Sequence, residues 1–453
     1  MNPNLSQPLV PVPNADPTIQ PPADDLQSSA AALKPQPRLR CADRRTLLPA
    51  MPLEDLVAPE HLARTVWQFV QGLDLTPLLE AIRSVEGRPG RPAIDPKLVV
   101  ALWLYATIEG IGSARAVAWL CANHPGFRWL CGGVEVNYHT LADFRVAHLD
   151  FLDELLTPSV APLMEQDLVD LNRVAQDGLR VRASAGAASF RRRPTLERCL
   201  EEARAQVQRL RDEVANDPGE ATRQQQKARE RAAREREERI HKALERMPEM
   251  EAKKKADDKE KARVSTTDPE ATVMKMADGG FRPAYNVQFS TDTTAQIIVG
   301  VEVATCGSDP GQMVPMVEQI YERYEQYPQD VLVEGGFVKH DDIDTVSAPE
   351  QGCTVYAPVP KPKEASKDRY APRATDSAAV AAWRQRMASA EAHAIYKDRA
   401  ATAECVNALA RNRGLRQLLV RGVAKVKAIA LWYAIAHNLL RAVSLRAALA
   451  THA

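Results

Sequence analysis

The sequence lacks paired cysteines and a conspicuous membrane-length apolar segment. Its seven cysteines are scattered through 453 residues without a CxxC pair. This pattern argues against a disulfide framework and a zinc knuckle, and it fits a reducing cytoplasm. The most apolar stretch, LVVALWLYATIEGI at 98–111, is shorter than the roughly 20 residues that cross a bilayer. The start of the sequence does not resemble a charged-then-apolar leader, so we expect a soluble cytoplasmic protein with no membrane partner.

Net charge is also absent. The chain has 59 Lys and Arg residues against 59 Asp and Glu residues, so its formal charge is zero. Composition therefore neither requires nor excludes nucleic acid, because the placement of charge matters more than its sum. The length and a hydrophobic content of 45% allow two or three domains with real cores.

The N-terminal third divides into two parts. Residues 1–48 are rich in proline and poor in large apolar side chains, which predicts a disordered arm. Residues 49–165 have helical spacing, with Asp95 as an expected N-cap before Pro96 and with Ser113 opening the next helix. This pattern fits either a DNA-binding helix-turn-helix or a helical hairpin that packs its own core. Basic residues in GRPGRP before it and polar, aromatic ones in NYHTLADFRVAH behind it favour DNA binding.

Residues 166–445 have a different pattern. Short apolar runs such as AYNVQFSTD, AQIIVGVEVAT and QDVLVEG alternate with helical segments such as GQMVPMVEQIYERY. This alternation predicts an α/β domain. Residues 191–263 interrupt it with a segment dense in Glu, Arg, Lys and Gln, for which we predict long solvated helices broken near NDPGE. The alternative for this insertion is a helical surface that lies against DNA or a second subunit.

Three acids occupy distinctive positions in the α/β region. Asp177 and Glu334 each follow a short apolar run and precede glycine, which predicts strands that present an acid at their tips. Glu404 lies on a predicted helix, where Asn407 and Arg411 follow three and seven residues later and share its face. Carboxylates fixed on rigid elements are the ligands that Mg²⁺ prefers.

These residues resemble the catalytic core of DDE transposases from bacterial insertion sequences. The resemblance is carried by Asp177 in DG, by the acid before GGF, and by Tyr396, Arg399 and Glu404 in YKDRAATAE, which NALARNRG follows. The blocks GRPAIDPKLVVALWLYATIEGIGSAR and RWLCGGVEVNYHTLADFR look like an InsH-type N-terminal domain. Together the blocks cover about 50–442 and are most similar to the insertion sequence 1182 group.

The resemblance implies a ribonuclease H-like catalytic domain with a helical insertion, preceded by an all-helical N-terminal domain. It implies a transposase that cuts and joins the ends of an insertion element by metal-dependent phosphodiester hydrolysis and transesterification. The expected partners are double-stranded DNA, as terminal inverted repeats and target, and a second copy of the chain in a homodimer on DNA. The expected location is the bacterial cytoplasm, at the nucleoid.

The resemblance also assigns roles to residues. Asp177, Glu334 and Glu404 would be the catalytic acids and would hold two Mg²⁺ or Mn²⁺ ions. Four further residues would contact DNA, and they are Tyr396, Arg399, Asn407 and Arg411.

One residue departs from the family pattern. The family has aspartate before GGF, whereas this chain has Glu334, which is longer by one methylene. Because Mg²⁺ requires near-ideal octahedral geometry, two outcomes stay open: an enzyme of reduced rate, or a catalytically weak or inactive DNA-binding remnant. A nuclease that cleaves without transposition would share the same acids. Asp341 and Asp342 are possible replacements for the second acid, whereas Asp309 is expected to cap the helix that follows it.

Overall fold

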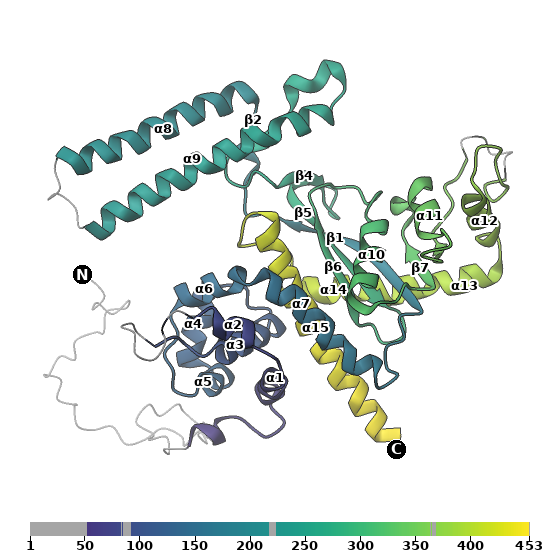
Figure 1. Ribbon diagram of the computed structural model, residues 1–453, viewed down its shortest axis with the longest axis horizontal. Coiled ribbons are helices and arrows are strands. Elements are labelled where there is room, and N and C mark those ends of the chain that lie inside the picture. Colours follow the sequence, from purple (N-terminus) through teal and green to yellow (C-terminus); the bar gives the residue numbers. More distant parts are fainter. Residues whose placement is uncertain are drawn as a thin grey trace, which may run out of the picture. The chain divides into compact units, whose positions relative to one another are not determined.

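The computed structural model describes residues 52–82, 84, 92–216, 223–362, 364 and 368–452. The predicted arm at 1–48 and most of the basic GRPGRP segment lie outside the described residues. Residues 51–453 form one compact unit, whose elements are labelled in Figure 1.

The N-terminal part of this unit is helical. After a short 3₁₀ turn at Leu53–Leu56, its helices are α1 (Leu62–Gln71), α2 (Thr76–Glu80), α3 (Pro96–Ile108), α4 (Ala114–Asn123), α5 (Pro125–Cys131), α6 (Tyr138–Ala147) and α7 (Leu149–Met164). The predicted caps are confirmed: the Asp95 carboxylate accepts from the Lys97 amide at 2.8 Å, and the Ser113 hydroxyl accepts from the Ala116 amide at 3.4 Å. Gly110, with φ of 73°, allows the turn between α3 and α4.

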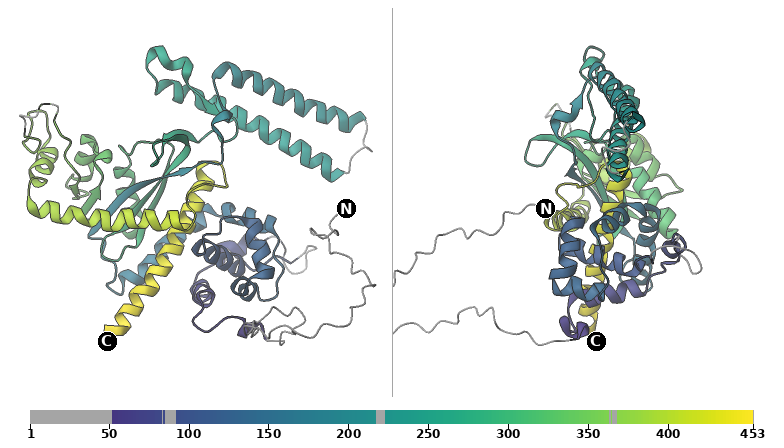
Figure 2. Two further views of the ribbon diagram at one scale, coloured as in Figure 1. Left: turned by 180° about the vertical axis from the view of Figure 1, so that it is seen from behind. Right: turned by 90° about the vertical axis from the view of Figure 1, so that its left-hand side faces the viewer.

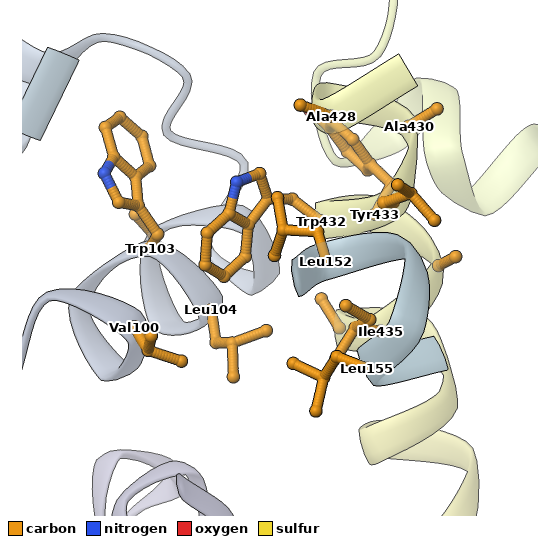
Figure 3. Packing of buried hydrophobic residues seen from close by; sticks show 14 of the residues in the cluster. Val100, Trp103, Leu104, Leu152, Leu155, Ala428, Ala430, Trp432, Tyr433 and Ile435 are labelled. Carbon is orange, nitrogen blue, oxygen red and sulfur yellow. The ribbon is translucent and has the colours of Figure 1, made fainter. Parts of the chain in front are cut away.

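Helix α3 is a core helix. Eleven of its 13 residues are buried, and it packs against α1, α5, α6 and the long C-terminal helix α15 (Val423–His452). The Trp103 indole donates to the Leu141 carbonyl at 3.0 Å. Figure 3 shows Trp103 and Leu104 of α3 close to Leu152 of α7 and Trp432 of α15. For α3, the structure therefore favours the core-packing interpretation over a helix presented to DNA.

A six-stranded mixed sheet follows. Its strands are β1 (Arg173–Arg182), β4 (Thr272–Lys275), β5 (Phe281–Asp292), β6 (Ile298–Ala304), β7 (Asp330–Val333) and β8 (Thr354–Tyr356). β1 lies at the centre, antiparallel to β5 and parallel to β7, and β8 continues the parallel side. β4 and β6 both pair antiparallel with β5, along different parts of its length. The α/β prediction is therefore confirmed at the level of a mixed sheet with helices.

The sheet and the N-terminal helices share one hydrophobic cluster. Leu179 of β1 and Phe289 of β5 belong to the same cluster as Trp103 of α3 and Trp432 of α15. A second cluster joins β7 and β8 to α10 (Met313–Tyr324), α11 (His340–Val346) and α12 (Ala378–Arg386). The predicted boundary at 165/166 falls between α7 and β1, but the hydrophobic core continues across it.

The charged segment folds as a helical hairpin, as its composition predicts. It comprises α8 (Arg193–Asn216) and α9 (Arg223–Ala252), followed by a 3₁₀ turn at Ala256–Lys261. The two helices pack on each other (Figure 2). A short sheet of β2 (Phe190–Arg191) and β3 (Val264–Ser265) closes the base of the hairpin.

Helix α15 is also relevant to the prediction that the chain has no membrane partner, because that prediction considers only the apolar stretch at 98–111. Within the described part of the chain, Val423–Thr451 is the one helix long and apolar enough to cross a bilayer, and 67% of its apolar window is buried in the protein. It packs against α7, β6 and α3. Its apolar side chains therefore have a protein environment, as those of a core helix do.

Candidate active site

Asp177 lies in the middle of β1, so the prediction that it sits at a strand tip is wrong. β1 continues to Arg182, because β5 pairs with it along its whole length from Val174. The parallel pairing with β7, however, stops at Gln176, opposite Val333. Asp177 is therefore the first residue of β1 beyond its parallel partner.

Glu334 follows the last residue of β7 directly. Gln176 and Val333 are the last pair of the parallel register, and the residues that follow them are Asp177 and Glu334. The two acids therefore occupy equivalent positions on neighbouring strands. The Glu334 side chain is about half exposed, at 48%. Gly335–Phe337 then form a 3₁₀ turn that leads away from the sheet.

Glu404 reaches the site through a π-helical turn. α13 (Ala390–Arg399) runs into a π turn at Ala400–Glu404 and then into α14 (Cys405–Asn412). In a regular α-helix, residues five apart are rotated by about 140°. The wider π turn brings Glu404 back over Arg399, and the Arg399 Nη2 donates to Glu404 Oε1 at 2.7 Å.

Arg399 lies between all three acids. Its Nη2 is 2.7 Å from Glu404 Oε1 and 3.4 Å from Glu334 Oε1, and its Nη1 is 3.9 Å from Asp177 Oδ2. The arginine is only 7% exposed. The structure thus brings the three acids, which are far apart in the chain, around one guanidinium group.

The other predicted residues divide in two. The Asn407 amide is buried and donates to Asp177 Oδ2 at 3.0 Å, and the Tyr396 ring stacks beside Arg399, 5.7 Å from its guanidinium carbon. Arg411, in contrast, is exposed on α14. Contact with DNA remains a prediction for Tyr396, Arg399, Asn407 and Arg411.

Burial and charge shift the pKa values at this site. Burial, and then the Glu334 charge, raise the pKa of Asp177 to about 6, although Arg399, the Gly178 amide and Asn407 act in the opposite direction. Burial alone would lower the pKa of Arg399, but the neighbouring Tyr396 and the three acids raise it overall. The site therefore holds more negative charge than its one arginine balances.

The acids suit a divalent metal in chemistry and in charge. Hard cations prefer carboxylate oxygens, and here the three carboxylates already converge on one positive group, the Arg399 guanidinium. Within the described residues, no group of three or more His, Cys, Asp or Glu is already arranged to hold a metal ion. Metal binding by Asp177, Glu334 and Glu404 therefore remains a prediction, and it would require the Arg399 guanidinium, which is bonded to Glu404, to leave the acids.

Of the two possible replacement acids, Asp342 is engaged elsewhere. Asp342 is buried, and its Oδ2 accepts from the Gly311 amide at 2.7 Å. Asp341 is exposed and lies 3.5 Å from the Lys339 ammonium.

The prediction that Asp309 caps a helix is wrong. The N-cap residue of α10 is Gln312, without a side-chain cap. Asp309 Oδ1 accepts instead from the Asn286 amide at 2.7 Å and from the Gln288 amide at 3.0 Å. The alternation of NVQF in β5 indicated that Asn286 and Gln288 share one face, but no sequence signal placed Asp309 against them.

Two family models match the chain. Residues 51–147 match the family described as Transposase domain (DUF772), and residues 350–443 match the Transposase DDE domain. These matches support a DDE-type transposase. A search of curated proteins and a search of solved structures gave no match.

The transposase matches cover different parts of the chain, and only the second includes residues of the site. The first spans α1 to α6, and the second spans Tyr396, Arg399 and Glu404 with α14 and most of α15. Asp177 and Glu334 lie between the two matches, so their assignment depends on the geometry around Arg399. DDE transposases generally use divalent metal ions and act on DNA, which agrees with the chemistry of these acids.

Proposed function

We propose that this chain is a DNA transposase of the insertion sequence 1182 group, which cuts and joins the ends of its element. The observation that carries the proposal is the convergence of Asp177, Glu334 and Glu404 on Arg399. A central strand with one antiparallel and one parallel neighbour, and acids where the parallel pair separates, supports a ribonuclease H-like catalytic domain.

Asp177, Glu334 and Glu404 would hold two Mg²⁺ or Mn²⁺ ions. When bound, such a pair activates the attacking water or 3′-hydroxyl and stabilises the leaving oxygen. Asn407 keeps Asp177 oriented through its amide, since that bond fixes Oδ2. Arg399 balances the acids before metal binds, and once released it offers a planar fork of donors to a DNA phosphate.

The exposed Arg411 and the N-terminal helices that match the transposase domain are the parts we assign to DNA contact, with Tyr396 beside Arg399. The partners are the terminal inverted repeats and a target duplex, and the active form is a homodimer on DNA. This work would take place in the bacterial cytoplasm, at the nucleoid.

The test uses the full chain and a labelled duplex that carries one terminal repeat from the DNA flanking the gene. With Mg²⁺ or Mn²⁺, we expect strand cleavage at the repeat end and, with a target duplex, strand-transfer products. Glu404→Gln should abolish both while binding of the duplex continues. Sequence-selective binding without cleavage by the unaltered chain would instead identify an inactive remnant, and cleavage without strand transfer would identify a nuclease.

Glu334 itself is tested by Glu334→Asp. Because a misplacement of about 1 Å at a reacting centre costs up to about 100-fold in rate, shortening this acid should raise the cleavage rate by about 10- to 100-fold. If neither version cleaves with either metal, the longer side chain is not the cause of inactivity.

A further inference from the structure

Two glycines that follow the catalytic acids face the same carboxylate, that of Asp309. A Cβ atom added at Gly178, next to Asp177, would lie only 2.6 Å from Asp309 Oδ1. A Cβ atom added at Gly336, two residues after Glu334, would lie 3.7 Å from Asp309 Oδ2. Asp309 therefore lies between the two backbone segments that carry the first and second acids.

Asp309 is held firmly in this position. It is 9% exposed, and besides the Asn286 and Gln288 amides, it has the Arg180 guanidinium 3.7 Å from Oδ2. These three partners lie on β1 and β5, whereas Asp309 belongs to the loop between β6 and α10. The loop is thus tied to the central strands through one side chain.

Packing around Gly178 leaves no room for a side chain. Asn286 Oδ1 and Gln288 Nε2 also lie within 2.5 and 2.6 Å of the added Cβ position. Asn286 is fully buried, and its Oδ1 has no hydrogen-bond partner among the residues that the structure describes. An unpaired buried acceptor costs stability. Here the acceptor, Asn286 Oδ1, lies beside the backbone of Gly178, the residue that follows Asp177.

We propose that Asp309 is a positioning residue of the active site, which sets the spacing between Asp177 and Glu334. It does so through the backbone, since Gly178 lets Oδ1 approach the segment of the first acid and Oδ2 lies in contact range of Gly336, in the segment of the second. The absence of a side chain at Gly178 is then a requirement of the site, whereas a Cβ atom at Gly336 would make an ordinary van der Waals contact with Asp309. The position of Asp309 between the two segments does not depend on the function of the chain, but its effect on metal binding rests on the proposed function.

The first experiment needs no metal. Hydrogen exchange by mass spectrometry on the full chain would compare wild type, Asp309→Asn and Gly178→Ala in peptides spanning 175–180 and 333–338. Asp309→Asn keeps the shape and removes the charge, whereas the Cβ atom of Gly178→Ala would displace the carboxylate together with the Asn286 and Gln288 side chains. We expect both variants to increase exchange at least threefold in both peptides, including the one that neither substitution touches.

The matched control is Asp292→Asn. Asp292 is a fully buried acid at the end of β5 whose Oδ2 accepts from the Ala295 amide at 2.6 Å. This variant should leave exchange in 333–338 unchanged. If Asp309→Asn likewise leaves 333–338 unchanged, or if Asp292→Asn changes it equally, the positioning role is refuted.

The second experiment measures Mn²⁺ affinity by electron paramagnetic resonance. Since losing a group that orients metal ligands typically costs 10- to 100-fold in metal affinity, Asp309→Asn should raise the Kd by about that factor, and Asp292→Asn should not. An unaltered Kd together with raised exchange would refute the effect on the metal ligands. If the wild-type chain binds no Mn²⁺, the proposed function fails, and the exchange data alone decide the role of Asp309.

Discussion

Arg399 shares its two terminal nitrogens among three carboxylates from three different elements. Removing it would leave three like charges close together, of which Asp177 is largely buried. Since Glu334 and Glu404 are about half exposed, solvent screens part of the repulsion. Under the proposed function, Arg399 thus supplies to the acids the positive charge that a bound metal ion would also supply.

Arg399→Ala should therefore lower the free energy of unfolding by about 1–3 kcal/mol in the absence of divalent metal. Adding Mg²⁺ should raise its thermal midpoint more than that of wild type, because a ligand stabilises the state that binds it and the acids are then free. Thermal unfolding with 0 and 10 mM Mg²⁺ measures both effects.

The control for this experiment is Arg384→Ala. Arg384 is also buried and pairs with Asp376 at 2.7 Å. Its loss should destabilise the chain without any extra response to Mg²⁺. Equal responses of the two variants would contradict the view that Arg399 stands in for a metal.

The raised pKa of Asp177 leads us to expect that the free energy of unfolding depends on pH. The folded pKa of about 6 lies above the ordinary value of 3.8, so the folded state binds the proton more tightly. The stability that this proton contributes is fully present below pH 4 and is lost as pH rises through 6. Asp177→Asn should therefore be more stable than wild type above pH 6, by about 1–3 kcal/mol, with the difference shrinking towards pH 4.

Urea unfolding of both proteins at pH 4, 5, 6 and 7 without divalent metal measures this difference. Asp292 titrates in the same range, since burial raises its pKa to about 6 as well, but it is present in both proteins. A difference that is constant with pH would show that the Asp177 carboxyl is not responsible.

At the scale of elements, the sequence predicts the strands that precede Asp177 and Glu334 better than it predicts how far β1 extends or how the helix carries Glu404. The run of apolar residues before each acid predicted β1 and β7, because a buried strand needs such a run. It could not show that β1 continues past Asp177, since that depends on β5, more than 100 residues later in the chain. Likewise, Arg399 and Glu404 are five positions apart, a spacing that does not predict their contact, because only a π turn brings them together.

That π turn gives a prediction for the helix. A π turn behaves as a one-residue insertion in an α-helix, so deleting Ala400 should restore α-helical spacing and keep the arginine and glutamate on one face. Inserting a second alanine there should rotate Glu404 away. We expect the deletion variant to retain cleavage within about tenfold and the insertion variant to lose it, in the labelled-duplex assay.

Circular dichroism melts of both variants provide the control, because each should retain a cooperative transition. Cleavage by the insertion variant at the wild-type rate would show that the contact between Arg399 and Glu404 is dispensable.

At the scale of the whole molecule, the N-terminal helices and the sheet depend on one core. The sequence separated 49–165 from 166–445 by the change in periodicity, which is a local signal. It could not show that α3, apolar on every side, is covered by α15 from the other end of the chain. A helix buried all round needs neighbours on all faces.

The isolated segment 49–165 should therefore not fold. Without α15 and the sheet, it would expose Trp103, Leu104 and the rest of α3, so its thermal melt should show no cooperative transition. A chain of residues 51–453 should melt like the full-length protein, because it is one compact unit. Circular dichroism of both proteins tests this, and a cooperative melt of 49–165 would contradict the shared core.

The hydrogen bond between Asp177 and Asn407 joins residues 230 positions apart. At about 5–20 residues per second, a ribosome takes roughly 10–50 s to travel between them. During that interval, the emerging polypeptide has its first acid but neither the third nor the amide that orients the first. Under the proposed function, a half-made chain therefore lacks a complete cutting centre, and neighbouring DNA would be protected from cleavage until translation is almost finished.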